Sequence, residues 1–179
     1  MTEPFEIREA QADDAAAIAG LHIESWRDVY RDILPKRYLE DEISREREQH
    51  WSKALSSPVP GNFVLLLERD GVLLGFVSVV RHADPNNDAE IENIHIRPGL
   101  RSGGMGRRLL GAAIQRLRNE GASSLFLWVF DDNTRAFKFY NMIGGQTDET
   151  GFDEFADGHM PHTRFSWCDL AELSDACQS

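Results

Sequence analysis

Three closely spaced glycines, Gly103, Gly104 and Gly106, stand directly before a predicted helix. Glycine has no side chain, so its backbone reaches conformations, and approaches a ligand, in ways that other residues cannot. Successive N–H groups can then converge on an anion at the helix start, where the helix dipole also favours negative charge. The spacing therefore predicts a loop that binds a phosphate group.

Positive charge is concentrated around the same loop. Residues 97–119 contain six arginines and no Asp or Glu, whereas the whole chain has a formal net charge of -11 and a pI of about 4.9. One basic island in an acidic protein favours a small polyanionic ligand. It argues against nucleic acid or an acidic lipid surface as the main partner.

Two common phosphate loops do not fit this sequence. The dinucleotide fingerprint has another glycine spacing, and the triphosphate loop needs a Gly-Lys-Ser/Thr triplet that is absent here. The segment instead resembles the pyrophosphate loop of the GNAT superfamily of acyl-CoA-dependent N-acetyltransferases. In that loop, Gln or Arg is followed after two residues by Gly and, one residue later, by Gly or Ala. Arg101, Gly104 and Gly106 fill these positions, whereas Gly103 departs from the family, which more often has Arg or Lys there.

A second match supports this resemblance. Asn133, Ala136, Phe139 and Tyr140 reproduce the family's pattern on the helix that follows the fifth strand. The resemblance implies that acetyl-CoA is the cofactor and that an acetyl group moves to a primary amine of a small molecule or a peptide. The residues that it assigns to cofactor binding are Ile94, His95, Ile96, Arg101, Ser102, Gly103, Gly104, Met105, Gly106, Arg107, Asn133 and Tyr140.

The attacking amine must lose a proton before it can react. An alkyl amine with a pKa of about 10.4 is deprotonated at pH 7 in roughly one molecule in 10³. Glu90 occupies the position where some family members carry a glutamate base, and Glu92 shares its strand face if no bulge intervenes. An ordinary carboxylate is a poor base for an ammonium group, so we expect a pKa raised by burial or relay through water. Both glutamates fit equally well as solvent-facing strand residues.

Tyr140 matches the tyrosine that the family uses to protonate the departing CoA sulfur. Full proton transfer from a phenol of pKa about 10 to a thiolate of pKa about 8.5 is uphill by about 2 kcal/mol, so we expect a hydrogen bond to the forming thiolate. The alternative is a helix tyrosine packed beside Phe137 and Phe139. Asn133 similarly fits a cofactor contact or a helix N-cap, and the two roles are compatible.

Trp26 and Tyr30 lie four residues apart on one face of a predicted helix. They fit an aromatic wall for a cationic acceptor, or a simple anchor of the helix on the sheet. No cysteine lies near the two motifs, which favours direct attack in a ternary complex over a covalent acyl-enzyme. A CoA-binding regulatory module without a working base remains the alternative function.

The elements that must position these residues can be read from periodicity and turn signals. Strands are predicted over residues 5–8, 63–68, 72–80, 90–97 and 124–130, with two more between 145 and 170. Helices are predicted over residues 15–30, 37–54, 104–119 and 133–143. The sum is an α/β fold with a mixed sheet of about seven strands and about four helices. A right-handed crossover makes two strands parallel, and the resemblance implies that this central pair splays apart.

Composition bounds the remaining expectations. A chain of 179 residues with 41% hydrophobic residues predicts one domain over residues 1–172 and a flexible tail over residues 173–179. No segment is apolar enough to span a bilayer and no signal peptide is visible, so we expect a cytoplasmic protein without a membrane partner. Cys168 and Cys177 are expected to be free thiols, and no metal site is predicted. The resemblance also allows a homodimer.

Overall fold

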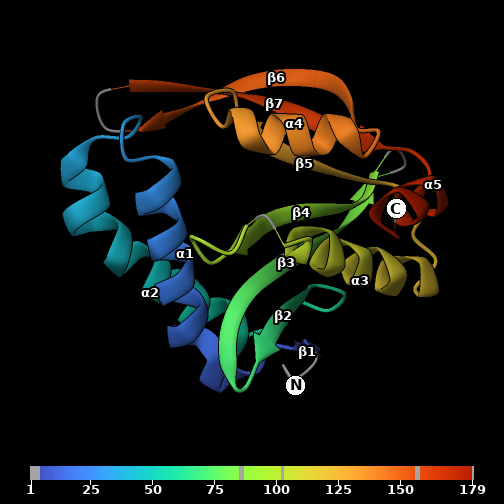
Figure 1. Ribbon diagram of the computed structural model, residues 1–179, viewed down its shortest axis with the longest axis horizontal. Helices are drawn as coiled ribbons and strands as arrows, with labels where there is room; N and C mark the ends of the chain where they lie inside the picture. Colours follow the sequence, from blue (N-terminus) through green and yellow to red (C-terminus); the bar gives the residue numbers. More distant parts are fainter. Residues whose placement is uncertain (1–4, 85–86, 102, 156–157, 179) are drawn as a thin grey trace.

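The strands of the computed structural model, which describes residues 5–84, 87–101, 103–155 and 158–178, form one sheet (Figure 1). Their bounds are β1 Glu6–Glu9, β2 Phe63–Arg69, β3 Val72–Asp84, β4 Asn87–Ile96, β5 Leu125–Phe130, β6 Gln146–Phe155 and β7 Gly158–Trp167. The seven strands follow the order β1-β2-β3-β4-β5-β7-β6. Neighbours are antiparallel except β4 and β5, which are parallel. The predicted mixed sheet with a central parallel pair is confirmed.

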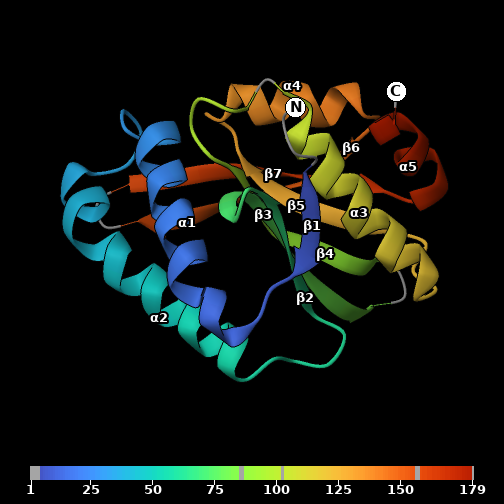
Figure 2. The same cartoon turned by 60° about the horizontal axis from the view of Figure 1, so that its bottom comes forward.

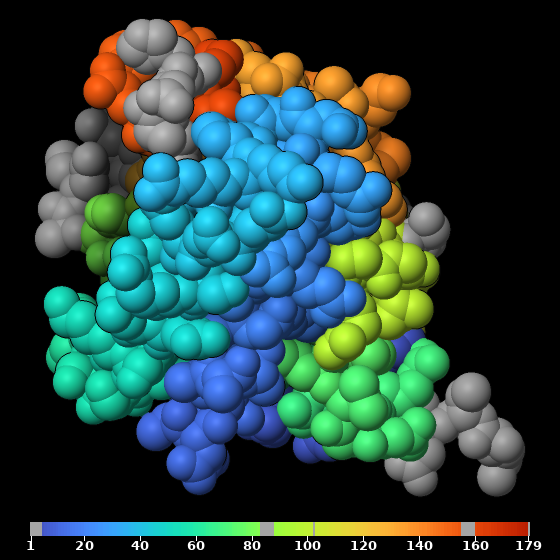
Figure 3. All heavy atoms as spheres, turned by 90° about the vertical axis from the view of Figure 1, so that its left-hand side faces the viewer, coloured from blue at the N-terminus to red at the C-terminus, as the bar shows by residue number. Residues whose placement is uncertain are grey.

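Helices cover both faces of this sheet. Their bounds are η1 Ala12–Asp14, α1 Ala15–Val29, η2 Tyr38–Glu42, α2 Ile43–Ser56, α3 Met105–Asn119, α4 Thr134–Met142 and α5 Leu170–Gln178. Here η1 is a short 3-10 helix and η2 is a π-helix that leads into α2. Figure 2 shows α1 and α2 on one side of the sheet and α3 on the other. Figure 3 shows α1 and α2 together as the outer layer of their side.

The end of the chain differs from the expected flexible tail. Residues 170–178 form α5, a fifth α-helix where about four were predicted. Leu170 and Leu173 are buried in the apolar cluster that also contains the inner face of α3. Burial of these two leucines stabilises the helix, because a short helix gains most of its stability from packing of its apolar face.

The strand β2 shows why the sheet needs helices on both faces. Its sequence is a continuous apolar run, as is typical of a strand that is buried on both sides. Phe63, Leu65 and Leu67 pack into the cluster shared with α3. Val64 and Leu66 pack into the cluster shared with α1 and α2.

The turn between β2 and β3 confirms the hairpin predicted from its sequence. Asp70 and Gly71 both have a positive φ, of 53° and 71°. Two successive residues with positive φ form the turn type that matches the twist of antiparallel strands, and Asp-Gly is one of its preferred sequences.

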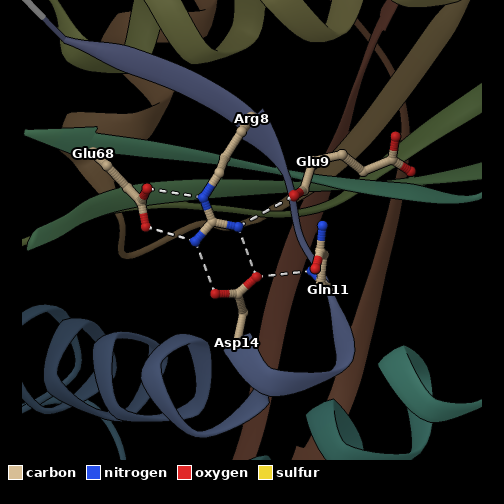
Figure 4. A network of polar contacts seen from close by, with 5 residues as sticks. All are labelled: Arg8, Glu9, Gln11, Asp14 and Glu68. Atoms are coloured by element: carbon tan, nitrogen blue, oxygen red, sulfur yellow. Dashed lines mark hydrogen bonds and ion pairs between the residues drawn. The ribbon is translucent and has the colours of Figure 1, made fainter. Parts of the chain in front are cut away.

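A network around Arg8 fixes the start of α1 on the sheet (Figure 4). The Arg8 guanidinium donates two hydrogen bonds of 2.8 Å to Asp14 and bonds of 2.8 and 2.9 Å to Glu68. Asp14 also accepts a bond from the Gln11 backbone, and these contacts, led by that from Arg8, lower its pKa. The planar guanidinium matches a carboxylate in this paired fashion, so one side chain joins β1, β2 and the turn before α1.

None of the helices in the described part of the chain combines the length and hydropathy needed to cross a membrane.

Candidate functional site

The candidate site is a cleft that begins where β4 and β5 part. The two strands share a single registered pair, Glu90 with Phe126. Beyond this pair they separate (Figure 1), and a cleft of about 560 Å³ lies between residues 91–96 of β4 and 127–130 of β5. Parallel strands without ladder bonds leave N–H and C=O groups available to a ligand, because each residue carries both.

The other end of this strand pair is closed by Asp88. Its Oδ2 accepts hydrogen bonds from the backbone N and the Oγ of Ser123, at 2.7 and 3.0 Å. It also accepts bonds from the N and Oγ of Ser124, at 3.1 and 3.2 Å. These bonds, led by that from the Ser123 backbone, lower the pKa of Asp88. One carboxylate therefore joins the start of β4 to the segment that leads into β5.

A β-bulge interrupts β4 at Glu92. On β3, Ser78 is the partner of Asn93 and the next residue, Val79, is the partner of Ile91, so Glu92 is an extra residue in the ladder. A bulge changes which face of the sheet the following side chains occupy. The alternation that the sequence analysis assumed through residues 90–96 is therefore broken at this point.

The bulge helps to separate the two glutamates that were candidate bases. Glu92 lines the cleft, is exposed, and accepts a hydrogen bond of 3.4 Å from Ser78. Glu90 does not line the cleft and lies instead 3.0 Å from Nε2 of His82. The sequence analysis expected a base that is either buried or reached through water. Because Glu92 is exposed, only proton transfer through water is left of these two routes. Of the two glutamates, only Glu92 lies in the cleft.

The glycine loop ends on the N-terminus of α3, beside the cleft. Gly104 is the N-cap residue and has a left-handed backbone with φ of 72°. The described residues provide no acceptor for the backbone N–H groups of Gly104, Met105, Gly106 and Arg107, which are the four that a helix start leaves unpaired. These four donors, here called the cradle, are available to an anion, and they lie where the sequence predicts a phosphate-binding loop.

No protein atom fills the space that a side chain at position 106 would occupy. A Cβ built on Gly106 meets no atom within 4 Å, and the same holds for Gly104. Packing within the protein therefore does not require glycine at position 106, and the open space lets a ligand approach the backbone there. This observation fits a diphosphate group on the cradle. Ser102, which was also predicted to bind the cofactor, lies outside the described residues.

Arg101 lines the cleft, but its guanidinium contacts other parts of the protein. Its Nε donates to the Ile96 carbonyl at 3.2 Å and its Nη2 donates to Ser25 Oγ at 3.1 Å. Its Nη1 pairs with Asp28 on α1. Arg101 therefore joins the glycine loop, the end of β4 and the helix α1, a contact set that the sequence motif did not predict.

Tyr140 lies on α4 at the cleft wall and is 6% exposed. Its ring packs against Phe139, Phe165 and Trp167. Burial, with a smaller contribution from nearby Tyr30, raises its pKa above the ordinary value of a phenol. The Tyr140 hydroxyl is therefore protonated at neutral pH and can donate a hydrogen bond.

Asn133 is the N-cap of α4 and also lines the cleft. Its side chain accepts a hydrogen bond of 3.2 Å from the backbone N of Ala136, which makes it the N-cap of α4. It also lines the cleft and donates a bond of 3.4 Å to the Tyr30 hydroxyl. Burial raises the pKa of Tyr30, so this phenol is also neutral.

Trp26 and Tyr30 form an aromatic wall together with Phe130. The Trp26 and Tyr30 ring centroids are 5.2 Å apart, and the Tyr30 and Phe130 centroids are 5.5 Å apart, both edge to face. All three residues line the cleft. Tyr30 is also buried against residues of α2 and β7, so it anchors α1 as well.

The charges along the cleft are unequal. Glu92 is the only carboxylate among the described residues that line it, whereas the lining cations are Arg101, Arg107 and Arg135. No group of three metal-ligating side chains occurs in the described part of the chain. The cleft thus has backbone donors without an acceptor at the α3 end and one carboxylate on β4 among its described lining residues.

Ser25 and His95 form a contact that the sequence analysis missed. His95 was predicted to line the cofactor strand and does line the cleft, but its Nδ1 lies 2.9 Å from Ser25 Oγ. Burial, aided by Arg101 and Arg47, lowers the pKa of His95 to about 3, so the ring is neutral at pH 7. The signal for Ser25 was a polar residue on the buried face of an amphipathic helix, one turn after Leu21.

Most of the predicted site residues lie together in this cleft. Those that line it are Trp26, Tyr30, Glu92, Ile94, His95, Ile96, Arg101, Gly104, Gly106, Arg107, Asn133 and Tyr140. Those outside it are Glu90, Gly103 and Met105, of which Met105 is buried in the core and Gly103 donates its N–H to Leu100. The lining residues that sequence reasoning missed include Ser25, Trp128, Phe130 and Arg135.

Comparisons with known proteins agree with this geometry. A family model described as the acetyltransferase (GNAT) family matches residues 23–144, which include every residue that lines the cleft. The uncharacterised N-acetyltransferase YuaI of Bacillus subtilis is 31% identical over 169 residues, covering 93% of this chain and 95% of that protein. The spermidine N(1)-acetyltransferase of Thermoplasma acidophilum is 26% identical over 157 residues, covering 84% and 94%. The structure of the PaiA N-acetyltransferase from the same organism in complex with coenzyme A has a TM-score of 0.73 at 22% identity, covering 92% and 100%.

Proposed function

This chain belongs to the acetyltransferase (GNAT) family, and on that premise we propose that it transfers an acetyl group from acetyl-CoA to a primary amine by direct attack in a ternary complex. The observation that carries the proposal is the cleft between β4 and β5. It joins an anion cradle at one end to a single carboxylate and an aromatic wall at the other.

The cofactor fits the residues that are present. The N–H groups of Gly104 to Arg107 would hold the diphosphate, and the absent side chain at Gly106 leaves the approach open. The backbone groups of residues 94–96 that face away from β3 would bind the amide-bearing arm. Acetyl-CoA supplies the activated acyl group as a thioester. The chain's own contribution is to orient the two reactants, which lowers the barrier by removing the entropy cost of their encounter.

Glu92 is the proposed base. It is the carboxylate that lines the cleft, and it can accept the proton that the acceptor ammonium must lose. Trp26 and Phe130 add aromatic rings, which attract cations, to this end of the cleft, and the Arg47 guanidinium already lies 5.8 Å from the centroid of the Trp26 ring. A small amine, such as the spermidine named for one relative, and a peptide amine both fit this description.

Tyr140 is proposed to stabilise the departing thiolate by donating a hydrogen bond. Its raised pKa makes outright proton transfer to sulfur still less favourable than for an ordinary phenol, so donation without transfer is the consistent role. Neither Cys168 nor Cys177 lines the cleft, which supports direct attack over a covalent acyl-enzyme.

The proposal is tested by incubating the protein with acetyl-CoA and a panel of amines that includes spermidine, and measuring free thiol. We expect turnover with at least one amine. Tyr140→Phe should lower kcat by about 10-fold or more with little change in the KM for acetyl-CoA, because it removes one hydrogen-bond donor to a developing charge. Tyr38→Phe is the matched control, since the Tyr38 hydroxyl donates to Glu46 and does not line the cleft. Undiminished kcat in Tyr140→Phe would exclude the assigned role.

A further inference from the structure

Three side chains in the cleft wall form a chain of hydrogen bonds. Nη2 of Arg101 lies 3.1 Å from Oγ of Ser25 on α1, and this Oγ lies 2.9 Å from Nδ1 of His95 on β4. All three residues line the cleft. The proposed mechanism uses none of these side chains, so their arrangement calls for a separate explanation.

The direction of each bond follows from the chemistry of the three groups. The Arg101 guanidinium can only donate, so Ser25 Oγ accepts. Ser25 is 2% exposed, and an enclosed hydroxyl normally donates its own hydrogen, for which Nδ1 of His95 is the acceptor among the described residues. Burial, aided by Arg101, lowers the pKa of His95 to about 3, so the ring is neutral and carries one hydrogen. Because Nδ1 accepts a bond, that hydrogen is on Nε2.

Nε2 of His95 is open to a ligand. It makes no hydrogen bond with any described residue and, in contrast to Nε2 of His22, it is not enclosed. Because His95 lines the cleft, a molecule in the cleft can accept a bond from this N–H group. Each bond of the chain is donated in the direction of the cleft and the first donor is a cation, so the bonds polarise one another and strengthen the last donor.

This donor lies on the face of the sheet that α1 covers. The ring centroid of His95 is 4.5 Å from that of His22 on α1 and 5.4 Å from that of Phe76 on β3. The neighbouring side chains on β4, Ile94 and Ile96, pack instead into the cluster shared with α3. Figure 2 shows α1 and α3 on opposite sides of the sheet, and the cradle belongs to α3. His95 is therefore on the side of the acceptor and not on the side of the diphosphate.

The charges on this side favour an acceptor that carries an anionic group. Arg101 begins the hydrogen-bond chain, and its partner Asp28 does not line the cleft. The Arg47 guanidinium lies 5.8 Å from the centroid of the Trp26 ring. Glu92, the proposed base, is the only carboxylate among the described residues that line the cleft. An acceptor with several ammonium groups thus meets no second carboxylate there, whereas a carboxylate meets a polarised N–H donor.

We propose that the acceptor is a small amine that also carries a carboxylate, as amino acids do, and that Nε2–H of His95 donates a hydrogen bond to this carboxylate. This inference rests on the proposed function and names its substrate class. Ser25 is a positioning residue that acts through His95, because its hydroxyl occupies Nδ1 and so keeps the hydrogen on Nε2. The bond would orient the acceptor, while its amine is left free to react.

The acceptor class is tested with pairs of amines that differ only in the carboxylate. Each pair consists of a standard amino acid and the amine formed by removal of its carboxyl group, and spermidine represents the polyamines. Thiol release with acetyl-CoA gives kcat/KM for each acceptor. We expect the best amino acid to exceed its partner by about 10-fold or more, because the partner cannot accept the charge-assisted bond.

The ratio of kcat/KM within the best pair shows whether His95 is responsible. His95→Phe keeps an aromatic ring without a donor and should lower this ratio by about 10-fold. General damage to the fold would lower both members of the pair and leave their ratio unchanged. His82→Phe is the matched control and should keep the wild-type ratio, because His82 pairs with Glu90 outside the cleft.

Ser25 is tested by two substitutions and by a spectroscopic readout. Ser25→Ala should lower the ratio severalfold, whereas Ser25→Thr, which keeps the hydroxyl, should retain it. Nitrogen-15 NMR distinguishes the two neutral forms of a histidine ring and needs no turnover. We expect the His95 hydrogen on Nε2 in wild type and on both nitrogens, in a mixture of the two forms, in Ser25→Ala.

The outcomes separate this inference from the proposed function. A wild-type ratio of one or less, an unchanged ratio in His95→Phe, or a wild-type His95 with its hydrogen on Nδ1 would each overturn the inference. Wild type that acetylates spermidine but no amino acid would overturn the inference and leave the proposed function in place. Wild type that releases no thiol with any amine would overturn the proposed function, and the acceptor class with it.

Discussion

The two ends of the β4–β5 pair are built in opposite ways. At the closed end, Glu90 and Phe126 are in register, and Asp88 accepts four hydrogen bonds from Ser123 and Ser124. At the open end, the strands share no registered pair, and the α3 amides have no acceptor among the described residues. Polar groups satisfied within the protein contribute stability, whereas those left unpaired are available to a ligand. Substitutions at the two ends should therefore affect different properties.

The largest effect is expected at the open end, from Gly106→Asp. The new carboxylate would project into the space that the structure leaves free at this position and repel a diphosphate on the cradle. Affinity for CoA, measured by calorimetry, should fall by about 100-fold or more. The melting temperature should change little, because no protein atom lies within 4 Å of the added Cβ.

Gly20→Asp supplies the control for added negative charge. Gly20 lies on α1, is exposed, and does not line the cleft. It should bind CoA like wild type. Equal CoA affinity in wild type and Gly106→Asp would show that the cradle is not where the diphosphate binds.

The next effect separates the two glutamates. Glu92→Gln should lower kcat by about 100-fold, because it removes the carboxylate that lines the cleft, and the KM for acetyl-CoA should be nearly unchanged. Glu90→Gln should keep kcat within about twofold, since Glu90 belongs to the closed end and pairs with His82. Thiol release at saturating amine measures both variants. A larger loss in Glu90→Gln than in Glu92→Gln would reverse the assignment.

Many of the residues at the open end could be singled out from the sequence, because glycine spacing and a basic segment are the local features that a phosphate-binding loop needs. Gly104 and Gly106 lie at the cleft, as does Tyr140 of the second motif. The antiparallel pairing of β2 with β3 also followed from a local signal, the Asp70-Gly71 turn. Backbone requirements of this kind act over a few residues, which is why they can be read without a structure.

The bulge at Glu92 escaped prediction, although the sequence carried a trace of it. Ile91, Ile94 and Ile96 all pack toward α3, and the first two are three residues apart, whereas an unbroken strand would separate them by an even number. The contacts of Arg101 with Ser25 and Asp28 could not be predicted. They join segments more than 70 residues apart, and no local pattern specifies such a pairing.

At the closed end, we expect a substitution to change the stability of the protein without changing its affinity for CoA. Asp88→Asn keeps the size of the side chain but removes the charge that strengthens four hydrogen bonds, so the free energy of unfolding should fall by about 2 kcal/mol. Because these bonds lie at the end away from the cradle, affinity for CoA should stay within about twofold. Urea unfolding and calorimetry report the two quantities separately. A loss of CoA affinity as large as that in Gly106→Asp would mean that the two ends are not independent.

The smallest effect concerns the stability of the protein in acid and His22, whose ring lies 4.5 Å from that of His95 in the cleft wall. His22 is fully buried, and burial lowers its pKa, so the unfolded chain binds a proton more readily than the folded one. Its contribution to stability is therefore complete above its unfolded pKa of about 6.5 and is lost as the pH falls below that value. Between pH 6.5 and 5.5 this histidine should remove about 1 kcal/mol from the free energy of unfolding.

His22→Asn tests this acid effect, because an asparagine oxygen can still accept the hydrogen bond from Trp51 while the side chain no longer titrates. Urea unfolding at pH 6.5 and 5.5 should show a loss of stability smaller by about 1 kcal/mol in His22→Asn than in wild type. His82→Asn, which changes a histidine at the closed end, should lose as much as wild type. If His22→Asn and wild type lose the same stability over this interval, then the pKa of His22 is the same in the folded and the unfolded protein. His22 would then be open to solvent and not enclosed, as it is in the structure.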